Sequence, residues 1–186
     1  MRVIAGSARR LNLITPKGMS TRPTSDKVKE TLFNILAPDL YQTSFLDLFA
    51  GSGGIGIEAL SRGSRHCTFV EKDKEALACI RKNLETTHFS ENATVYPYDV
   101  LGISSSLHST GAFDIVFMDP PYDQGLEAKT LSMLAKSSLI DKDTLLIAEV
   151  SSANDMSYAT GLGYEIIRIK EYKNNKHVFM RLEEKA

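Results

Sequence analysis

The chain has 186 residues, of which 42% are hydrophobic, so it is long enough to bury the core of one domain. It contains no apolar stretch long enough to span a membrane, and its first ten residues, MRVIAGSARR, lack the apolar segment of a secretory signal, which predicts a cytoplasmic protein. The net charge of −1 is unevenly distributed, because residues 1–30 hold seven Lys or Arg against two acids and the remainder is acidic.

The basic N-terminal arm can be explained in two ways. A basic arm on an acidic body is typical of a protein whose arm meets a polyanion. A solvated surface hairpin whose charge is incidental would show the same uneven distribution of charge. Charge alone therefore does not decide between the two explanations.

Cys67 and Cys79 are the two cysteines of the chain, and they lie 12 positions apart without a C-x-x-C spacing or paired histidines. We therefore expect two buried thiols in a reducing cytoplasm, and neither a disulfide nor a metal site.

Residues 1–43 are predicted to form an N-terminal extension that belongs to the same globule as the rest. Residues 2–14 are expected to form two short strands around Gly6 and Ser7, as a hairpin. Residues 24–36 are expected to form a helix that Thr24 or Ser25 caps. Its apolar stripe consists of Val28, Leu32 and Ile35.

From residue 44 onward, strands and helices are predicted to alternate. The expected strands are 44–50, 66–71, 93–99, 112–119 and 143–150, and the expected helices are 54–63, 73–87 and 124–136. Two last strands, 163–172 and 176–184, predict a terminal hairpin that adds an antiparallel strand. The first five strands are apolar and are expected to be fully buried, as a parallel sheet covered by helices requires. We expect a doubly wound α/β domain over 44–186, with its ligands beyond the carboxyl ends of the strands.

The stretch AGSGGIG, residues 50–56, matches the G-x-G-x-x-G pattern, and Glu71 follows 20 positions after Gly51. This pattern is typical of a dinucleotide-binding oxidoreductase. Asp47 argues against a dinucleotide, because a carboxylate four residues before Gly51 would repel a pyrophosphate. It would suit the α-ammonium of S-adenosylmethionine, which carries no phosphate. The alternative is that Asp47 is a carboxylate that caps the helix or braces the loop.

Three acids, Asp47, Glu71 and Asp99, end three successive predicted strands. Glu71 can accept hydrogen bonds from a ribose diol, and Asp99 can accept from an adenine amine. Taken alone, Asp99 is more commonly a turn residue. Taken together, the three acids match the three polar parts of S-adenosylmethionine, and the glycines allow close backbone approach.

The predicted strand 112–119 ends in the motif D-P-P-Y, which comprises Asp119, Pro120, Pro121 and Tyr122. The prolines remove two backbone donors, so the carboxylate of Asp119 and the carbonyl of Pro120 remain as acceptors beside an aromatic ring. A planar group that bears an NH₂ can donate to both acceptors and stack on the ring, and a nucleobase must be unpaired or flipped out to do so. These bonds would free the nitrogen lone pair for in-line attack on a sulfonium methyl. The motif predicts amine methylation, without choosing between adenine N6, guanine N2 and a protein glutamine.

The chain resembles a known family in several segments. LDLFAGSGGIGIEALSRG, VEKD and DPPY resemble the motifs of class I, Rossmann-like S-adenosylmethionine-dependent methyltransferases. MRVIAGSARRLNL, TRPTSDKVKETLFNIL and FDIVFMDPPYDQG are similar, in the expected order, to the bacterial 16S rRNA guanine-N2 methyltransferase family. The second of these segments is the most specific, because generic methyltransferases lack it.

The resemblance implies a seven-stranded, mostly parallel sheet of order 3-2-1-4-5-7-6, with strand 7 antiparallel, helices on both faces and a small RNA-binding β-hairpin at the N-terminus. It implies methyl transfer from S-adenosylmethionine to guanine N2 of 16S rRNA, either free or in an assembling small subunit. We expect a monomer that needs neither a metal nor a membrane. Many relatives carry Asp at the position of Glu71, and either carboxylate can accept from a ribose diol.

The resemblance also assigns residues to three roles. The cofactor residues are Asp47, Phe49, Ala50, Gly51, Gly53, Glu71, Lys72, Asp99 and Val100. The residues at the substrate amine are Asp119, Pro120, Pro121 and Tyr122. The RNA-binding residues are Arg9, Arg10, Arg22 and Thr24.

Three other functions are compatible with parts of the sequence. A DNA adenine-N6 methyltransferase usually needs a separate target-recognition region, for which this chain leaves little room. A non-catalytic rRNA-binding assembly factor is disfavoured by the intact set of acceptors. A dehydrogenase is disfavoured by Asp47 and by the D-P-P-Y motif.

Overall fold

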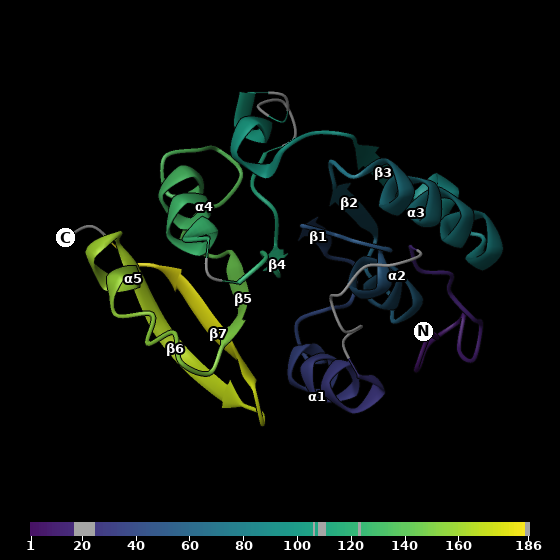
Figure 1. The fold of residues 1–186 in the computed structure, drawn as a ribbon, viewed down its shortest axis with the longest axis horizontal. Coiled ribbons are helices and arrows are strands. Elements are labelled where there is room, and N and C mark those ends of the chain that lie inside the picture. The colour runs from purple at the N-terminus through teal and green to yellow at the C-terminus, as the bar shows by residue number, and fades with distance from the viewer. Residues whose placement is uncertain (17–24, 106, 108–110, 123, 185–186) are drawn as a thin grey trace. The chain divides into compact units, whose positions relative to one another are not determined.

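A computed structural model describes residues 1–16, 25–105, 107, 111–122 and 124–184 (Figure 1). The chain divides into two compact units, Met1–Tyr98 (unit 1) and Asp99–Ala186 (unit 2). The boundary predicted between residues 43 and 44 falls inside unit 1 and stays a prediction.

Unit 1 contains three parallel strands and the helices that connect them (Figure 1). Its elements are α1 (Asp26–Leu36), β1 (Ser44–Leu48), α2 (Gly54–Ser61), β2 (His66–Val70), α3 (Lys74–Thr87), the 3₁₀ helix η1 (Ser90–Asn92) and β3 (Ala93–Tyr96). Leu48 pairs with Val70, and Val70 pairs with Tyr96. Because the three strands run parallel, the residues that follow them lie at one edge of the sheet.

Unit 2 contains the remaining four strands. Its elements are η2 (Val100–Ser105), β4 (Ile115–Met118), α4 (Leu126–Leu134), β5 (Leu145–Ser151), α5 (Tyr158–Gly161), β6 (Tyr164–Glu171) and β7 (Asn175–Leu182). β4 pairs with β5 in parallel, and β7 pairs with both β5 and β6 in antiparallel fashion. The predicted terminal hairpin is therefore confirmed as β6 and β7.

The seven strands form one sheet in the order β3-β2-β1-β4-β5-β7-β6. This order and the antiparallel β7 confirm the predicted fold class. Side-chain caps place the starts of α1 and α3 within two residues of the predicted positions. The Ser25 side chain accepts from the Val28 amide at the start of α1, and Asp73 accepts from the Ala76 amide at the start of α3.

The predicted N-terminal hairpin forms in part. Its two arms are joined by hydrogen bonds from the amide of Val3 to the carbonyl of Leu11 at 3.0 Å and from the amide of Leu13 to the carbonyl of Met1 at 2.8 Å. The two predicted strands do not form, because residues 1–16 contain a single antiparallel bridge, between Arg2 and Asn12. The amides of Ile4 and Ala5 donate to the side chain of Glu58 at 2.8 and 3.0 Å, so a carboxylate of α2 also holds this segment.

Two burial patterns also differ from expectation. β3 is half-buried along its length because it lies at an edge of the sheet, so it is not the fully buried strand that was predicted. α1 buries Lys29, Phe33 and Leu36 together with Leu32, whereas Val28 and Ile35 stay partly exposed. The buried face of α1 is rotated from the apolar stripe because Lys29 points toward Glu58, with the two charged groups 3.2 Å apart.

Candidate active site

The loop between β1 and α2 has an unusual backbone. Phe49, Gly51 and Gly53 all adopt positive φ angles, of 58°, 56° and 79°. The amide of Gly53 closes the turn by donating to the carbonyl of Ala50, at 2.8 Å. A Cβ atom placed on Gly51 would meet nothing within 4 Å, so this backbone borders open space. The loop thus offers a ligand a bare stretch of main chain.

Gly56 serves a different purpose from Gly51. A Cβ atom on Gly56 would lie 2.4 Å from Cε1 of Phe69 and 2.5 Å from Sγ of Cys67. The third glycine of the pattern is therefore required where α2 packs on β2. Cys67 and Cys79 are both buried and free, as predicted.

Asp47 lies inside unit 1, where its side chain is 1% exposed. Its Oδ2 accepts a hydrogen bond from the amide of Gly56 in the first turn of α2, at 2.9 Å. Burial and, to a smaller extent, the charge of the nearby Glu71 carboxylate raise the pKa of Asp47 to about 8, against the Gly56 hydrogen bond that lowers it. The loop-bracing contact that was weighed as the alternative is present, and a contact with an ammonium stays a prediction.

Glu71 follows β2 and braces the same loop. Its Oε2 accepts from the amide of Gly51 at 2.8 Å, and its Oε1 accepts from the amides of Lys72 and Asp73 at 2.8 and 2.9 Å. The carboxylate is half-buried and points at the open glycine turn. Since a carboxylate has about four lone-pair sites, one acceptor site remains beside these three bonds for a hydroxyl donor.

Asp99 and Val100 begin unit 2. Asp99 is exposed, and its Oδ1 accepts from the amide of Leu101 at 3.0 Å, which is the turn geometry common for this residue type. Val100 is buried at the start of η2. The role of Asp99 toward an adenine amine stays a prediction.

The D-P-P-Y motif follows β4 directly, as predicted. Asp119 is half-buried, Pro120 is buried, and Pro121 and Tyr122 are exposed. The side chain of Tyr122 is 39% exposed, so its ring is accessible. Burial of its hydroxyl and the charges of Glu149 and Asp119 raise the pKa of Tyr122 well above its ordinary value, so that the phenol stays neutral.

Arg9 and Arg10 are exposed on the turn of the N-terminal segment. Arg10 adopts a φ of 73°, and its amide donates to the carbonyl of Val3 at 3.0 Å. Arg22 and Thr24, the other residues assigned to RNA, lie outside the described residues.

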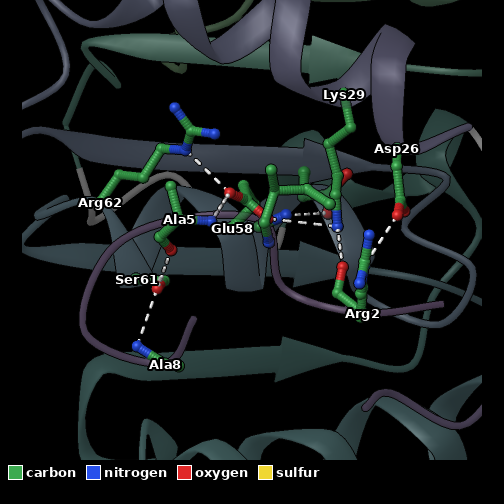
Figure 2. Close-up of polar contacts among 11 residues, drawn as sticks. Arg2, Ala5, Ala8, Asp26, Lys29, Glu58, Ser61 and Arg62 are labelled. Carbon is green, nitrogen blue, oxygen red and sulfur yellow. Dashed lines mark hydrogen bonds and ion pairs between the residues drawn. The ribbon is translucent and has the colours of Figure 1, made fainter. Parts of the chain in front are cut away.

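A buried ion cluster anchors this segment to α2, and Figure 2 shows Glu58 at its centre. Arg62 approaches one carboxylate oxygen at 2.8 Å and Lys29 approaches the other at 3.2 Å. Lys29 also donates to the carbonyl of Arg2, at 2.6 Å. Desolvation lowers the pKa of Lys29, against the raising effect of Glu58. Sequence reasoning missed this cluster, because charged residues are ordinarily expected at the surface.

Close packing completes the docking of the segment. A Cβ atom on Gly6 would lie 1.8 Å from the carbonyl oxygen of Ser61, so the main chain itself touches α2. Asn83 of α3 accepts from the amide of Ile14 at 2.8 Å and donates to the carbonyls of Ile14 and Ser52, both at 2.9 Å. One buried amide thus ties the N-terminal segment to the glycine loop.

The family model described as "Conserved hypothetical protein 95" matches residues 1–181. The chain belongs to this family. It is 40% identical over 152 residues to "Ribosomal RNA small subunit methyltransferase D" of Haemophilus influenzae, which covers 80% of this chain and 78% of that protein. It is 37% identical over 157 residues to the protein of that name in Escherichia coli K12, over 84% and 77% of the two chains.

The fold of this family is seen in a solved structure from Escherichia coli, that of "Putative methyltransferase yhhF". It matches with a TM-score of 0.81 and 33% identity, over 98% of each chain. The predicted resemblance is confirmed at the level of family and fold. Among the described residues, no helix is long and apolar enough to cross a membrane. Within the same ranges, no three His, Cys, Asp or Glu side chains are gathered as metal ligands would be.

Proposed function

We propose that this protein transfers a methyl group from S-adenosylmethionine to the exocyclic N2 amine of a guanine in 16S rRNA. The observation that carries the proposal is the D-P-P-Y turn after β4, where half-buried Asp119 and donor-free prolines precede the accessible ring of Tyr122. The names of the relatives from Haemophilus influenzae and Escherichia coli support rRNA of the small subunit as the substrate.

The polar groups of unit 1 fit S-adenosylmethionine better than a dinucleotide. Gly51 presents open main chain at a positive φ, and the carboxylates of Glu71 and Asp47 border the loop. The Glu71 carboxylate would repel an anionic pyrophosphate and would accept a hydrogen bond from a ribose diol, whereas an ammonium would pair with Asp47 in its ionised form. The other residues assigned to the cofactor are Phe49, Ala50, Gly53 and Lys72 in unit 1 and Asp99 and Val100 in unit 2. When bound, the cofactor supplies an electrophilic methyl on a sulfonium.

The residues of the D-P-P-Y turn would hold the guanine amine. The carboxylate of Asp119 and the carbonyl of Pro120 accept its two N–H bonds, which draws the nitrogen lone pair out of conjugation with the ring. Tyr122 stacks on the base and fixes its plane. Asp119 need not be a strong base, because the methylated ammonium is acidic and loses its proton late. Holding the amine in line with the methyl contributes on the order of 7–11 kcal/mol to lowering the barrier.

Arg9 and Arg10 would meet the phosphates of the RNA from the anchored N-terminal turn. Arg22 and Thr24 are assigned to the same partner. The proposal includes free 16S rRNA and an assembling small subunit as alternative forms of the substrate, which the experiment below separates.

The test is transfer of labelled methyl to RNA from a strain that lacks this gene, with naked 16S rRNA and isolated small subunits assayed in parallel. We expect N2-methylguanosine, identified by mass, in at least one of the two. N6-methyladenosine, or transfer to DNA, would support the adenine methyltransferase instead. RNA binding without any transfer would support an assembly factor.

Asp119→Ala tests the role of the motif. We expect it to lower kcat by roughly a hundredfold or more, because an acceptor that organises the transition state is lost. The affinity for S-adenosylhomocysteine, measured by calorimetry, should change by no more than about twofold. An equal loss of cofactor affinity would show that Asp119 belongs to the cofactor site.

A further inference from the structure

A buried polar cluster lies at the carboxyl end of β5, within unit 2. Glu149 stands opposite His177 in the pairing of β5 with β7, and its Oε2 is 2.9 Å from Nε2 of the imidazole. Its Oε1 accepts from the side-chain amide of Asn175. On the far side of the imidazole, Nδ1 lies 3.1 Å from the hydroxyl of Tyr172. His177 is 0% exposed and Glu149 is 5% exposed, so water has little access to the cluster.

Aromatic packing fixes the imidazole of His177. Its ring meets the rings of Phe117 and Tyr172 edge-on, with centroids 5.9 and 5.1 Å apart, and it meets Phe179 in the same way at 6.5 Å. Contacts on three sides restrict the directions in which Nε2 can point. The carboxylate of Glu149 is held between this nitrogen and the side-chain amide of Asn175.

The cluster adjoins the D-P-P-Y turn. β4 and β5 are parallel with Met118 opposite Ala148, so the next pair along the two strands is Asp119 and Glu149. The hydroxyl of Tyr122 lies within hydrogen-bonding reach of the side chains of Glu149 and Asn175. The tip of Tyr122 thus reaches the buried cluster, while 39% of the side chain remains accessible.

We propose that Glu149, held by His177 and Asn175, is a positioning residue that anchors the hydroxyl of Tyr122 and so fixes the ring on which the target base stacks. This inference rests on the proposed function, which assigns the stacking to Tyr122. An anchored ring is already ordered before the base arrives, so less conformational entropy is lost on binding. The base plane is also set more sharply, which matters because a misplacement of about 1 Å can cost a hundredfold in rate.

The competing explanation is purely structural, namely that the Glu149–His177 pair only joins β5 to β7. Burial of a carboxylate costs several kcal/mol unless it is well paired, and apolar residues would join two strands without that cost. A structural role predicts that loss of Glu149 lowers stability and acts independently of the Tyr122 hydroxyl. A positioning role predicts that the effects of substituting Glu149 and of removing the Tyr122 hydroxyl are not additive.

A double-mutant cycle on methyl transfer separates these explanations. Tyr122→Phe removes only the hydroxyl, and Glu149→Gln keeps the shape of the side chain but replaces one acceptor oxygen with a donor. We expect each to lower kcat by about tenfold, with the affinity for S-adenosylhomocysteine unchanged, and the double variant to be no slower than the slower single variant. Independent losses that multiply to about a hundredfold would overturn the inference.

A second measurement needs neither RNA nor cofactor. In protein with ¹³C-labelled tyrosine rings, the Tyr122 signal is identified by its disappearance in Tyr122→Phe. We expect this signal to shift and broaden in Glu149→Gln and in Asn175→Ala. The second variant is included because Asn175 is only half-buried, so its substitution tests the same contact if Glu149→Gln fails to fold. Tyr164→Phe is the matched control, since it removes a buried hydroxyl of unit 2 that donates to Leu131.

The outcomes of this measurement are distinct from those of the methylation assay. An unchanged Tyr122 signal in both Glu149→Gln and Asn175→Ala would overturn the positioning role, whatever the substrate. Absence of methyl transfer to rRNA by the unaltered protein would overturn the proposed function and would leave the ring measurement to decide the anchoring.

Discussion

At the scale of single residues, the ionisation of Asp47 makes the stability of the fold depend on pH, and the proposed ammonium contact would make cofactor binding depend on the same proton. Its pKa is raised from 3.8 to about 8 in the folded protein by burial. Between these two values the folded state holds a proton that the unfolded state has released. The free energy of unfolding therefore falls as the pH rises from about 4 to about 8, and this contribution is constant above that window.

Asp47→Asn is predicted to remove this decline, because the amide stays neutral at every pH. In urea denaturation at several pH values, the free energy of unfolding of the variant should rise relative to that of the unaltered protein as the pH increases toward about 8.

The affinity for the cofactor should depend on pH in the opposite direction to the stability. If Asp47 accepts the ammonium, the affinity for S-adenosylmethionine rises with pH through the same window and is lower and flatter in the variant. Equal affinities, measured by calorimetry, would leave Asp47 with its loop-bracing contact alone.

For the three acidic residues near the strand ends, the sequence allowed their positions to be predicted but not their hydrogen-bond partners. The positions of Asp47 near the end of β1, of Glu71 directly after β2 and of Asp99 shortly after β3 could be predicted, because strand ends follow from the alternation of apolar runs. Their hydrogen-bond partners could not, because these depend on the path of the loop main chain. Glu71 bonds the amide of Gly51, and Asp47 bonds that of Gly56, although each was expected to face a ligand.

At the scale of elements, the glycines between β1 and α2 separate ligand approach from helix packing. Gly51→Ala meets no neighbouring atom, but its φ of 56° costs an alanine about 1–2 kcal/mol of stability. Gly56→Ala drives a methyl group into Phe69 and Cys67 and is expected to cost about 1–3 kcal/mol.

The two substitutions should differ in their effect on the cofactor. Gly51→Ala is predicted to reduce the affinity for S-adenosylhomocysteine by more than about tenfold, since the added methyl occupies the open space. Gly56→Ala should bind nearly as well as the unaltered protein at a temperature where it is folded. Urea denaturation measures the loss of stability, and calorimetry on the same samples measures the affinity for S-adenosylhomocysteine. Equal affinities for the two variants would contradict a ligand at Gly51.

Elements built on apolar periodicity were predictable, and those built on buried charge were not. The strands β1, β2, β4 and β5 and the face of α3 follow from their apolar residues. The face of α1 and the path of the N-terminal segment do not, because both depend on Glu58. A sequence pattern treats Lys29 and Glu58 as surface residues, whereas each is 0% exposed in the fold. Their burial requires mutual pairing and the amides of Ile4 and Ala5, which are more than fifty residues away from Glu58 in the sequence.

At the scale of the whole molecule, the distribution of charge matters more than its sum. The chain has a net charge of −1, yet the first 30 residues are strongly basic and the rest is acidic. A polyanion is repelled by most of such a protein and attracted by one segment. Because Glu58 anchors this segment to α2, Arg9 and Arg10 are presented from a fixed turn, and if they bind RNA as proposed they should neutralise the same phosphates in every complex.

The joint substitution of Arg9 and Arg10 by Gln should therefore change the salt dependence of RNA binding as well as its strength. Each phosphate contact in single-stranded RNA contributes about 0.7 to the slope of log K against log salt, so the loss of two contacts should reduce the slope by about 1.4. Lys74→Gln with Lys82→Gln is the matched control, because it removes the same charge from exposed positions on α3. Filter binding across a salt series measures both slopes. If the control lowers the slope as much as the arginine variant does, net charge alone accounts for binding and the anchored turn has no particular role.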